Sequence, residues 1–224
     1  LKQKPCFPQY YSFSSASLAT DSDKSVASVR VMSLLQTGEA LLHVYKYSEC
    51  QKRYEEALNI SEHDLGPSSR EMGLSLNCLA QLHHIKGNLF EALDMYNRSK
   101  ATLSEDYKLN RILLASIENN MSVVYQSFQD YEEGVKHLQK AADMLNLDVK
   151  LELDQKIDIF SRIGAIRMSQ GNLEEAKNNF LKVINLIEAY PQGSIRDTNL
   201  GKIELELGDI FEKEGDLKSA LIYR

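Results

Sequence analysis

The hexapeptide GNLEEA, at residues 171–176, recurs in altered form along the chain and decides the fold. Near copies are GNLFEA at 87–92, QDYEEG at 129–134, GDLKSA at 215–220 and the more divergent YKYSEC at 45–50. Successive copies begin 42, 42, 42 and 44 residues apart. A constant period of this length is typical of repeat architectures, in which each unit stacks on the next.

Each repeat predicts two helices joined by a tight turn. Within residues 77–96, apolar side chains recur every three or four positions, and the pattern is interrupted near Gly87. Two columns of the superposed copies hold only small residues, which helices need where they cross at about 8 Å. The first column, seven residues before each turn, contains Gly38, Ala80, Ser122, Gly164 and Gly208. The second, five residues after each turn begins, contains Cys50, Ala92, Gly134, Ala176 and Ala220.

These columns resemble the tetratricopeptide repeat family over about residues 30–224. The family pattern places a small residue in the first helix, a large one three positions later, Gly at the turn, and Ala with an aromatic residue in the second helix. The second copy carries it as Ala80, His83, Gly87, Ala92 and Tyr96. The period of 42, where roughly 34 is usual, is similar to the repeats of kinesin light chains. The resemblance implies an all-α, right-handed superhelical α-solenoid of antiparallel helix pairs.

The expected organisation is an N-terminal extension, residues 1–20, followed by a helical repeat domain, residues 21–224, with about five repeats and the last one incomplete. The extension carries Ser, aromatic residues and Lys but no acidic residue. Its interpretation stays open between the remnant of an organellar transit peptide and a disordered extension or an arm lying on the first helices. A solenoid end needs a polar cap, so either the chain continues past Arg224 or a partner covers this end, and we expect the former.

Composition limits the classes of function. The 224 residues are 43% hydrophobic and carry a formal net charge of -6, which provides no basic field for nucleic acid or anionic membrane. The three cysteines form no CxxC pair, which favours a reducing intracellular compartment, either cytoplasmic or, from the N-terminal stretch, mitochondrial or plastid. No apolar run approaches the roughly 18 residues that a membrane span requires, so we expect no membrane insertion.

The resemblance also implies a site. In the family, the first helices of the pairs line a concave groove that holds an extended peptide or a partner's helix. Asn and Gln suit this role because an amide both donates and accepts hydrogen bonds. At the acidic end, the fifth copy favours Lys or Arg on the partner. Carried over column by column, the partner-binding residues are Asn77, Gln81, His84, Asn119, Asn120, Gln126, Arg162, Ser169, Glu206, Asp209 and Glu212.

Catalytic patterns are weak. His83 and His84 are adjacent on a helix and therefore point to different faces, so they cannot share a metal. Cys78 has no neighbouring base in the sequence. The chain contains no GxGxxG, P-loop, HExxH or GxSxG motif. We therefore expect no enzymatic activity, no cofactor and no metal.

The leading hypothesis is a non-enzymatic scaffold or adaptor that binds another protein, through a peptide segment or a subunit, in the groove. The first alternative is a structural subunit of a large assembly, including one in a mitochondrion or plastid. A helical-repeat RNA binder is the second alternative, and the carboxylates of the fifth copy argue against its basic groove.

Overall fold

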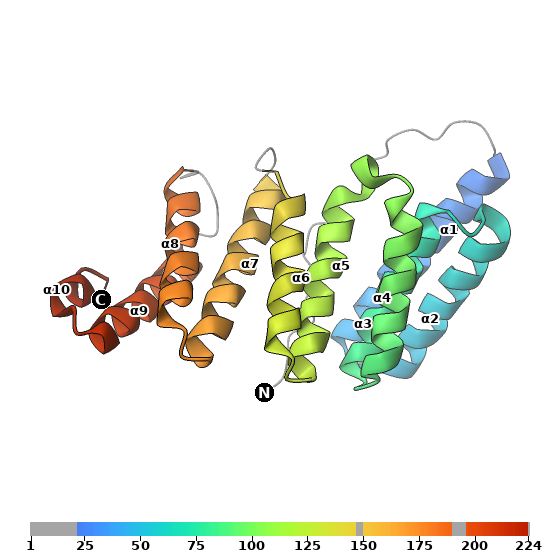
Figure 1. Cartoon of the computed structure of the whole chain (residues 1–224). Helices are drawn as coiled ribbons and strands as arrows, with labels where there is room; N and C mark the ends of the chain where they lie inside the picture. Colours follow the sequence, from blue (N-terminus) through green and yellow to red (C-terminus); the bar gives the residue numbers. More distant parts are fainter. Residues whose placement is uncertain (1–21, 147–149, 190–195, 224) are drawn as a thin grey trace. The chain divides into compact units, whose positions relative to one another are not determined.

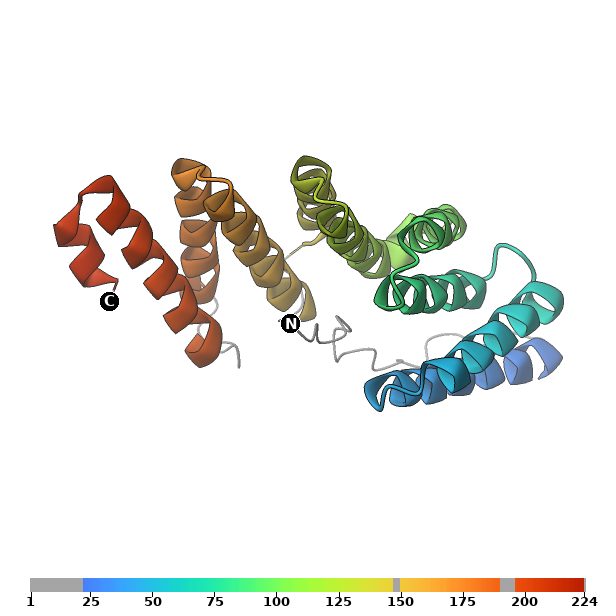
Figure 2. The ribbon, with the colours of Figure 1, turned by 90° about the horizontal axis from the view of Figure 1, so that it is seen from below.

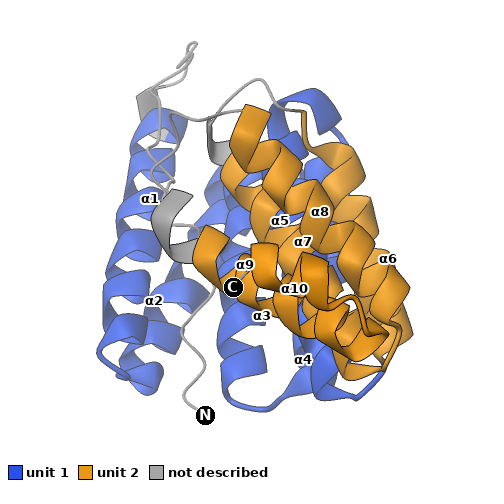
Figure 3. Cartoon of the chain, turned by 90° about the vertical axis from the view of Figure 1, so that its left-hand side faces the viewer, with its two compact units in different colours: residues 1–130 blue, residues 131–224 orange. Residues whose placement is uncertain are grey.

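The computed structural model describes residues 22–146, 150–189 and 196–223, and these are helical with no strand among them. The prediction of an all-α helical repeat is thereby confirmed. The proposed extension at residues 1–20 lies outside the described residues. The chain divides into two compact units, residues 1–130 and residues 131–224 (Figure 3). The boundary falls at the turn of the third copy.

Unit 1 contains two helical pairs followed by a single helix (Figure 1). Helix α1 packs against α2, and α3 packs against both α2 and α4, while α4 also contacts α5. The view in Figure 2 shows the α1–α2 pair side by side. The bounds are α1 Ser22–His43, α2 Tyr47–Ile60, the π-helical segment η1 Ser61–Leu65, α3 Arg70–Ile85, α4 Leu89–Ser104 and α5 Tyr107–Ser127.

Unit 2 begins with the second helix of the third copy and continues with two helical pairs. Helix α7 packs against α6 and α8, and α9 packs against α8 and α10. The bounds are α6 Tyr131–Met144, α7 Lys150–Ser169, α8 Leu173–Ala189, α9 Arg196–Glu214 and α10 Leu217–Ile222.

The turns keep one backbone conformation in all five copies. The first residue of each copy has a positive φ, between 62° and 83°, which reverses the chain between the two helices. Gly occupies this position three times because it has no Cβ to clash in the left-handed region. Tyr45 (φ 62°) and Gln129 (φ 64°) hold the same conformation at a steric cost. The alignment of the copies, including the divergent first one, is therefore confirmed.

The small columns lie at helix crossings, as predicted. A Cβ added to Gly38 would lie 2.2 Å from the ring of Tyr54, and one added to Gly164 would lie 2.5 Å from the ring of Phe180. Both aromatic residues are buried, with exposed fractions of 0% and 1%. In each case the ring comes from the second helix of the pair and rests on the backbone of the first.

Candidate functional site

In unit 1, the predicted binding residues stand on α3 and α5. Asn77 and Gln81 are one helical turn apart on α3, and both side chains are buried, as is Asn120 on α5. Sequence reasoning placed these amides on an open face, so their burial is a new finding. His84, Asn119 and Gln126 are partly exposed at the borders of the same faces.

The Oδ1 atom of Asn77 is buried and has no hydrogen-bond partner among the described residues. A buried acceptor without a partner costs roughly 1–3 kcal/mol relative to one that is satisfied. Native structures keep few such groups, and each calls for an explanation. The Oδ1 atom of Asn77 is therefore an unsatisfied acceptor inside the packing around α3, which a donor could reach only if the side chains that cover it moved aside.

Around this amide, the neighbouring polar and thiol groups are held in their neutral forms. Burial lowers the pKa of His84, whose Nε2 lies 3.3 Å from the Ser127 hydroxyl. Burial also raises the pKa of the Cys78 thiol, so that it stays protonated at neutral pH. This part of α3 consequently offers amides and a neutral thiol.

In unit 2, the predicted binding residues are more exposed, and some of them already contact other residues of their own helix. The Ser169 hydroxyl donates to the carbonyl oxygen of Ile166 at 2.7 Å, and Arg162 lies 4.0 Å from Asp158. Asp209 and Glu212 on α9 are exposed, and Glu206 is half-buried, with its Oε2 atom buried and unpartnered among the described residues. The three carboxylates occupy one face of α9 because they are spaced by three residues. The continuous groove predicted to run along both units stays a prediction.

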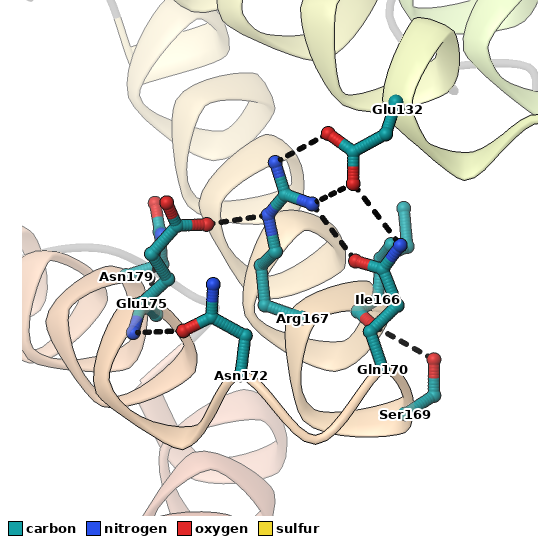
Figure 4. Close-up of polar contacts among 8 residues, drawn as sticks. All are labelled: Glu132, Ile166, Arg167, Ser169, Gln170, Asn172, Glu175 and Asn179. Atoms are coloured by element: carbon teal, nitrogen blue, oxygen red, sulfur yellow. Dashed lines mark hydrogen bonds and ion pairs between the residues drawn. The ribbon is translucent and has the colours of Figure 1, made fainter.

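Arg167 is a polar centre of unit 2 that sequence reasoning missed (Figure 4). It projects from α7 between Glu132 of α6 and Glu175 of α8. Its Nη1 and Nη2 atoms donate to the Glu132 carboxylate, Nη2 at 3.1 Å, and its Nε atom forms an ion pair with Glu175. Gln170 also contacts both, accepting from Arg167 at 2.8 Å and donating to Glu132 at 3.2 Å. Hydrogen bonds from Arg167 lower the pKa of Glu132, and those to Glu132 raise the pKa of Arg167.

A signal for this centre was present in the sequence. Arg167 stands four residues before its turn, in the column that Tyr125 and Phe211 occupy in the neighbouring copies. A charged residue in an aromatic packing column requires charged partners, and Glu132 of α6 and Glu175 of α8 supply them. The arrangement joins α6, α7 and α8 of one unit through ion pairs and hydrogen bonds.

The described residues give no support for metal chemistry or for membrane insertion. Within residues 22–146, 150–189 and 196–223, no three His, Cys, Asp or Glu side chains are grouped to hold a metal ion. None of the helices described is both long enough and apolar enough to cross a membrane. The suggestion of organellar targeting rests on residues 1–20, which the structure does not describe.

Comparison with known sequences agrees with the repeat pattern. The tetratricopeptide repeat family matches residues 71–146 and again residues 157–190. The Arabidopsis thaliana protein KINESIN LIGHT CHAIN-RELATED 1 is 24% identical over 218 residues. That alignment covers 89% of this chain and 34% of the relative, so the chain spans about a third of that protein.

Solved structures share the fold at low sequence identity. BtubC (BKLC) from P. vanneervenii has a TM-score of 0.66 at 16% identity, covering 90% of this chain and 86% of its own. A Podosopora anserina protein with nearly identical TPR-like repeats has a TM-score of 0.67 at 15% identity, with coverage of 88% and 92%. Aspartyl phosphate phosphatase F from Bacillus subtilis has a TM-score of 0.68 at 16% identity, covering 89% and 50%. At these identities the similarity shows the fold and carries no activity across.

Proposed function

Because the chain is a tetratricopeptide repeat protein, we propose that it is a non-enzymatic scaffold that holds an extended segment of a partner protein against α3 and α5. Tetratricopeptide repeats typically mediate protein–protein interaction. The observation that supports binding at this face is the buried Oδ1 atom of Asn77, which has no hydrogen-bond partner among the described residues. A backbone N–H of a bound segment would satisfy this acceptor once the side chains that cover it move aside on binding.

The chemistry of the face matches a peptide backbone. Gln81 lies one turn after Asn77 on α3, and its amide carries both a donor and an acceptor, as a peptide unit does. Asn120 adds a third amide from α5. An uncharged segment therefore fits better than a charged one, because burying a charge against neutral amides is costly. The acidic face of α9 would favour Lys or Arg in a segment bound to unit 2.

The test uses the intact chain and peptides selected on it. Dodecapeptides that bind the chain are selected from a random phage-displayed library, and the strongest is synthesised for isothermal titration calorimetry. We expect the double variant Asn77→Ala with Gln81→Ala to weaken binding at least tenfold. The matched control is Asn97→Ala, which removes an exposed amide on α4 of the same unit. Circular dichroism checks that each variant keeps its helical content.

The proposal has a clear contrary outcome. Selected peptides that bind the double variant as tightly as the parent chain would remove this face from the interaction. Equal weakening by Asn97→Ala would show that the loss is not specific to α3. Either result would leave the structural subunit of a larger assembly as the better hypothesis, to be pursued by co-purification of the intact chain with its partners.

A further inference from the structure

We propose that Phe90 and Phe128 form a second interaction surface, which receives a short partner segment with a large apolar side chain next to a basic one. The two residues belong to unit 1, at the turn end of its helices. Their rings contact each other, with centroids 5.1 Å apart and planes tilted by 50°. Phe90 is the second residue of α4 and is 77% exposed, while Phe128 caps the end of α5 and is half-buried.

The equivalent positions in later copies are polar. Phe90 is three residues after the start of its turn, and Phe128 is the residue before the next turn. One copy later these positions are Glu132 and Gln170, which hydrogen-bond at 3.2 Å. One further copy on they are Glu174 and Glu214, and Lys177 bridges them at 3.0 Å and 2.9 Å. The repeat is therefore built with polar side chains at this edge, and packing of the fold does not demand the aromatic pair.

The size of the surface argues against a second copy of the chain. A buried Phe accounts for about 150–250 Å², whereas a stable dimer buries roughly 800 Å² per partner. Two rings that are already in mutual contact fall well short of that area. They are sufficient as an anchoring point for one large apolar side chain, because a few aromatic contacts dominate the affinity of small interfaces.

The charge around Phe90 is acidic. Glu91 follows it directly and is exposed, and Asp94 stands one helical turn later on the same side of α4. The Asp94 side chain is 70% exposed and has only a 3.9 Å contact with Arg98. An anchoring apolar residue flanked by Lys or Arg would place its positive charge beside these carboxylates, which favours such a segment over an acidic one.

The test uses the intact chain with ¹³C-labelled Phe and three capped hexapeptides. The first presents Leu-Phe with Lys on each side, the second replaces both Lys by Glu, and the third replaces Leu-Phe by Ser-Ser. We expect the first peptide alone to shift the ring signals of Phe90 and Phe128 in NMR titrations. Phe90→Glu, the residue found in the next two copies, and Phe90→Ser should each weaken binding at least tenfold. Leu109→Glu is the matched control, since Leu109 is 65% exposed on α5 of the same unit.

Several results would overturn the proposal. Ring signals that stay unshifted with the first peptide would show that nothing of this chemistry docks there. Equal binding of the Glu-flanked peptide would remove the preference for basic residues. Sedimentation equilibrium tests whether a second copy of the chain occupies this surface instead. A dimer of the parent chain that Phe90→Glu abolishes would show that it does. Loss of peptide binding in Phe90→Glu with unchanged behaviour of Asn77→Ala and Gln81→Ala separates this surface from the face of α3 and α5.

Discussion

Replacing Gly164 by Ala tests the helix crossing in the fourth copy. The added Cβ would lie 2.5 Å from Cε1 and 2.8 Å from Cδ1 of the Phe180 ring. Phe180 is 1% exposed and lies in the packed centre of unit 2, so the ring cannot swing into solvent. Overpacking of this kind costs about 1–3 kcal/mol. Ala also gains about 1 kcal/mol of helix propensity over Gly, which leaves a net loss near 1 kcal/mol.

Gly201 provides the matched control for the same substitution. It lies inside α9 of the same unit, it is exposed, and a Cβ added there would meet nothing within 4 Å. Gly201→Ala should therefore show the propensity gain alone, and stabilise the chain by about 0.5–1 kcal/mol. The two variants differ only in what the new methyl group touches.

Thermal unfolding followed by circular dichroism at 222 nm compares the two variants. For a chain of this size, 1 kcal/mol shifts Tm by roughly 2–4 °C. We expect Gly164→Ala to melt roughly 2–4 °C below the parent and Gly201→Ala to melt above it. If both variants were stabilised, Phe180 would not pack on the backbone of α7, and the small columns would need another explanation.

Three further perturbations follow from the same structure. Gln129→Gly should raise the free energy of unfolding in urea by about 0.5–1 kcal/mol, because it relieves a left-handed residue (φ 64°), and an unchanged value would count against the turn geometry. Ala176→Leu should lower the free energy of unfolding by about 1–3 kcal/mol because this position is fully buried; a variant as stable as the parent would place Ala176 outside the crossing. Burial raises the pKa of Cys50 from about 9 to about 11, so the folded state favours the neutral thiol. Stability from this group is complete below pH 9 and is lost as the pH rises towards 11. Urea unfolding at pH 8, 9.5 and 11 should show a smaller decline for Cys50→Ala, and identical declines would contradict this assignment.

The repeat architecture could be predicted because its determinants are local. A positive φ at the turn favours Gly, and Gly87 and Gly171 provided that signal directly. A crossing point needs small residues, which recur at fixed offsets whatever the rest of the repeat contains. The copies reinforce one another, so Tyr45 and Gln129 could be placed at turns even though neither residue favours a left-handed conformation.

The site was harder to predict because it depends on contacts between copies. Helical periodicity shows which face of its own helix Asn77 occupies, but its burial depends on which helices pack around it. Arg167 was missed for the same reason, since Glu132 and Glu175 stand 35 residues before it and 8 after it. The pairing of Phe90 with Phe128 likewise joins residues 38 positions apart. Superposing the copies would have shown Arg167 as a charged residue in an aromatic column, and Phe90 and Phe128 as aromatic residues in polar columns.

At the turn ends of the helices, the residues that fix the fold are different from the side chains that meet between copies. The backbone there is fixed by one left-handed residue per copy, and the crossing of each pair is fixed by the small columns. The side chains that meet between copies at this edge are needed neither for the turn nor for the helix crossing. They form an aromatic pair, a Glu–Gln pair and a pair of Glu bridged by Lys. The chemistry of this edge can therefore be changed one copy at a time, because neither the turn nor the helix crossing depends on these side chains. Engineered repeats could in this way keep the fold of the chain and differ in the partners that they contact.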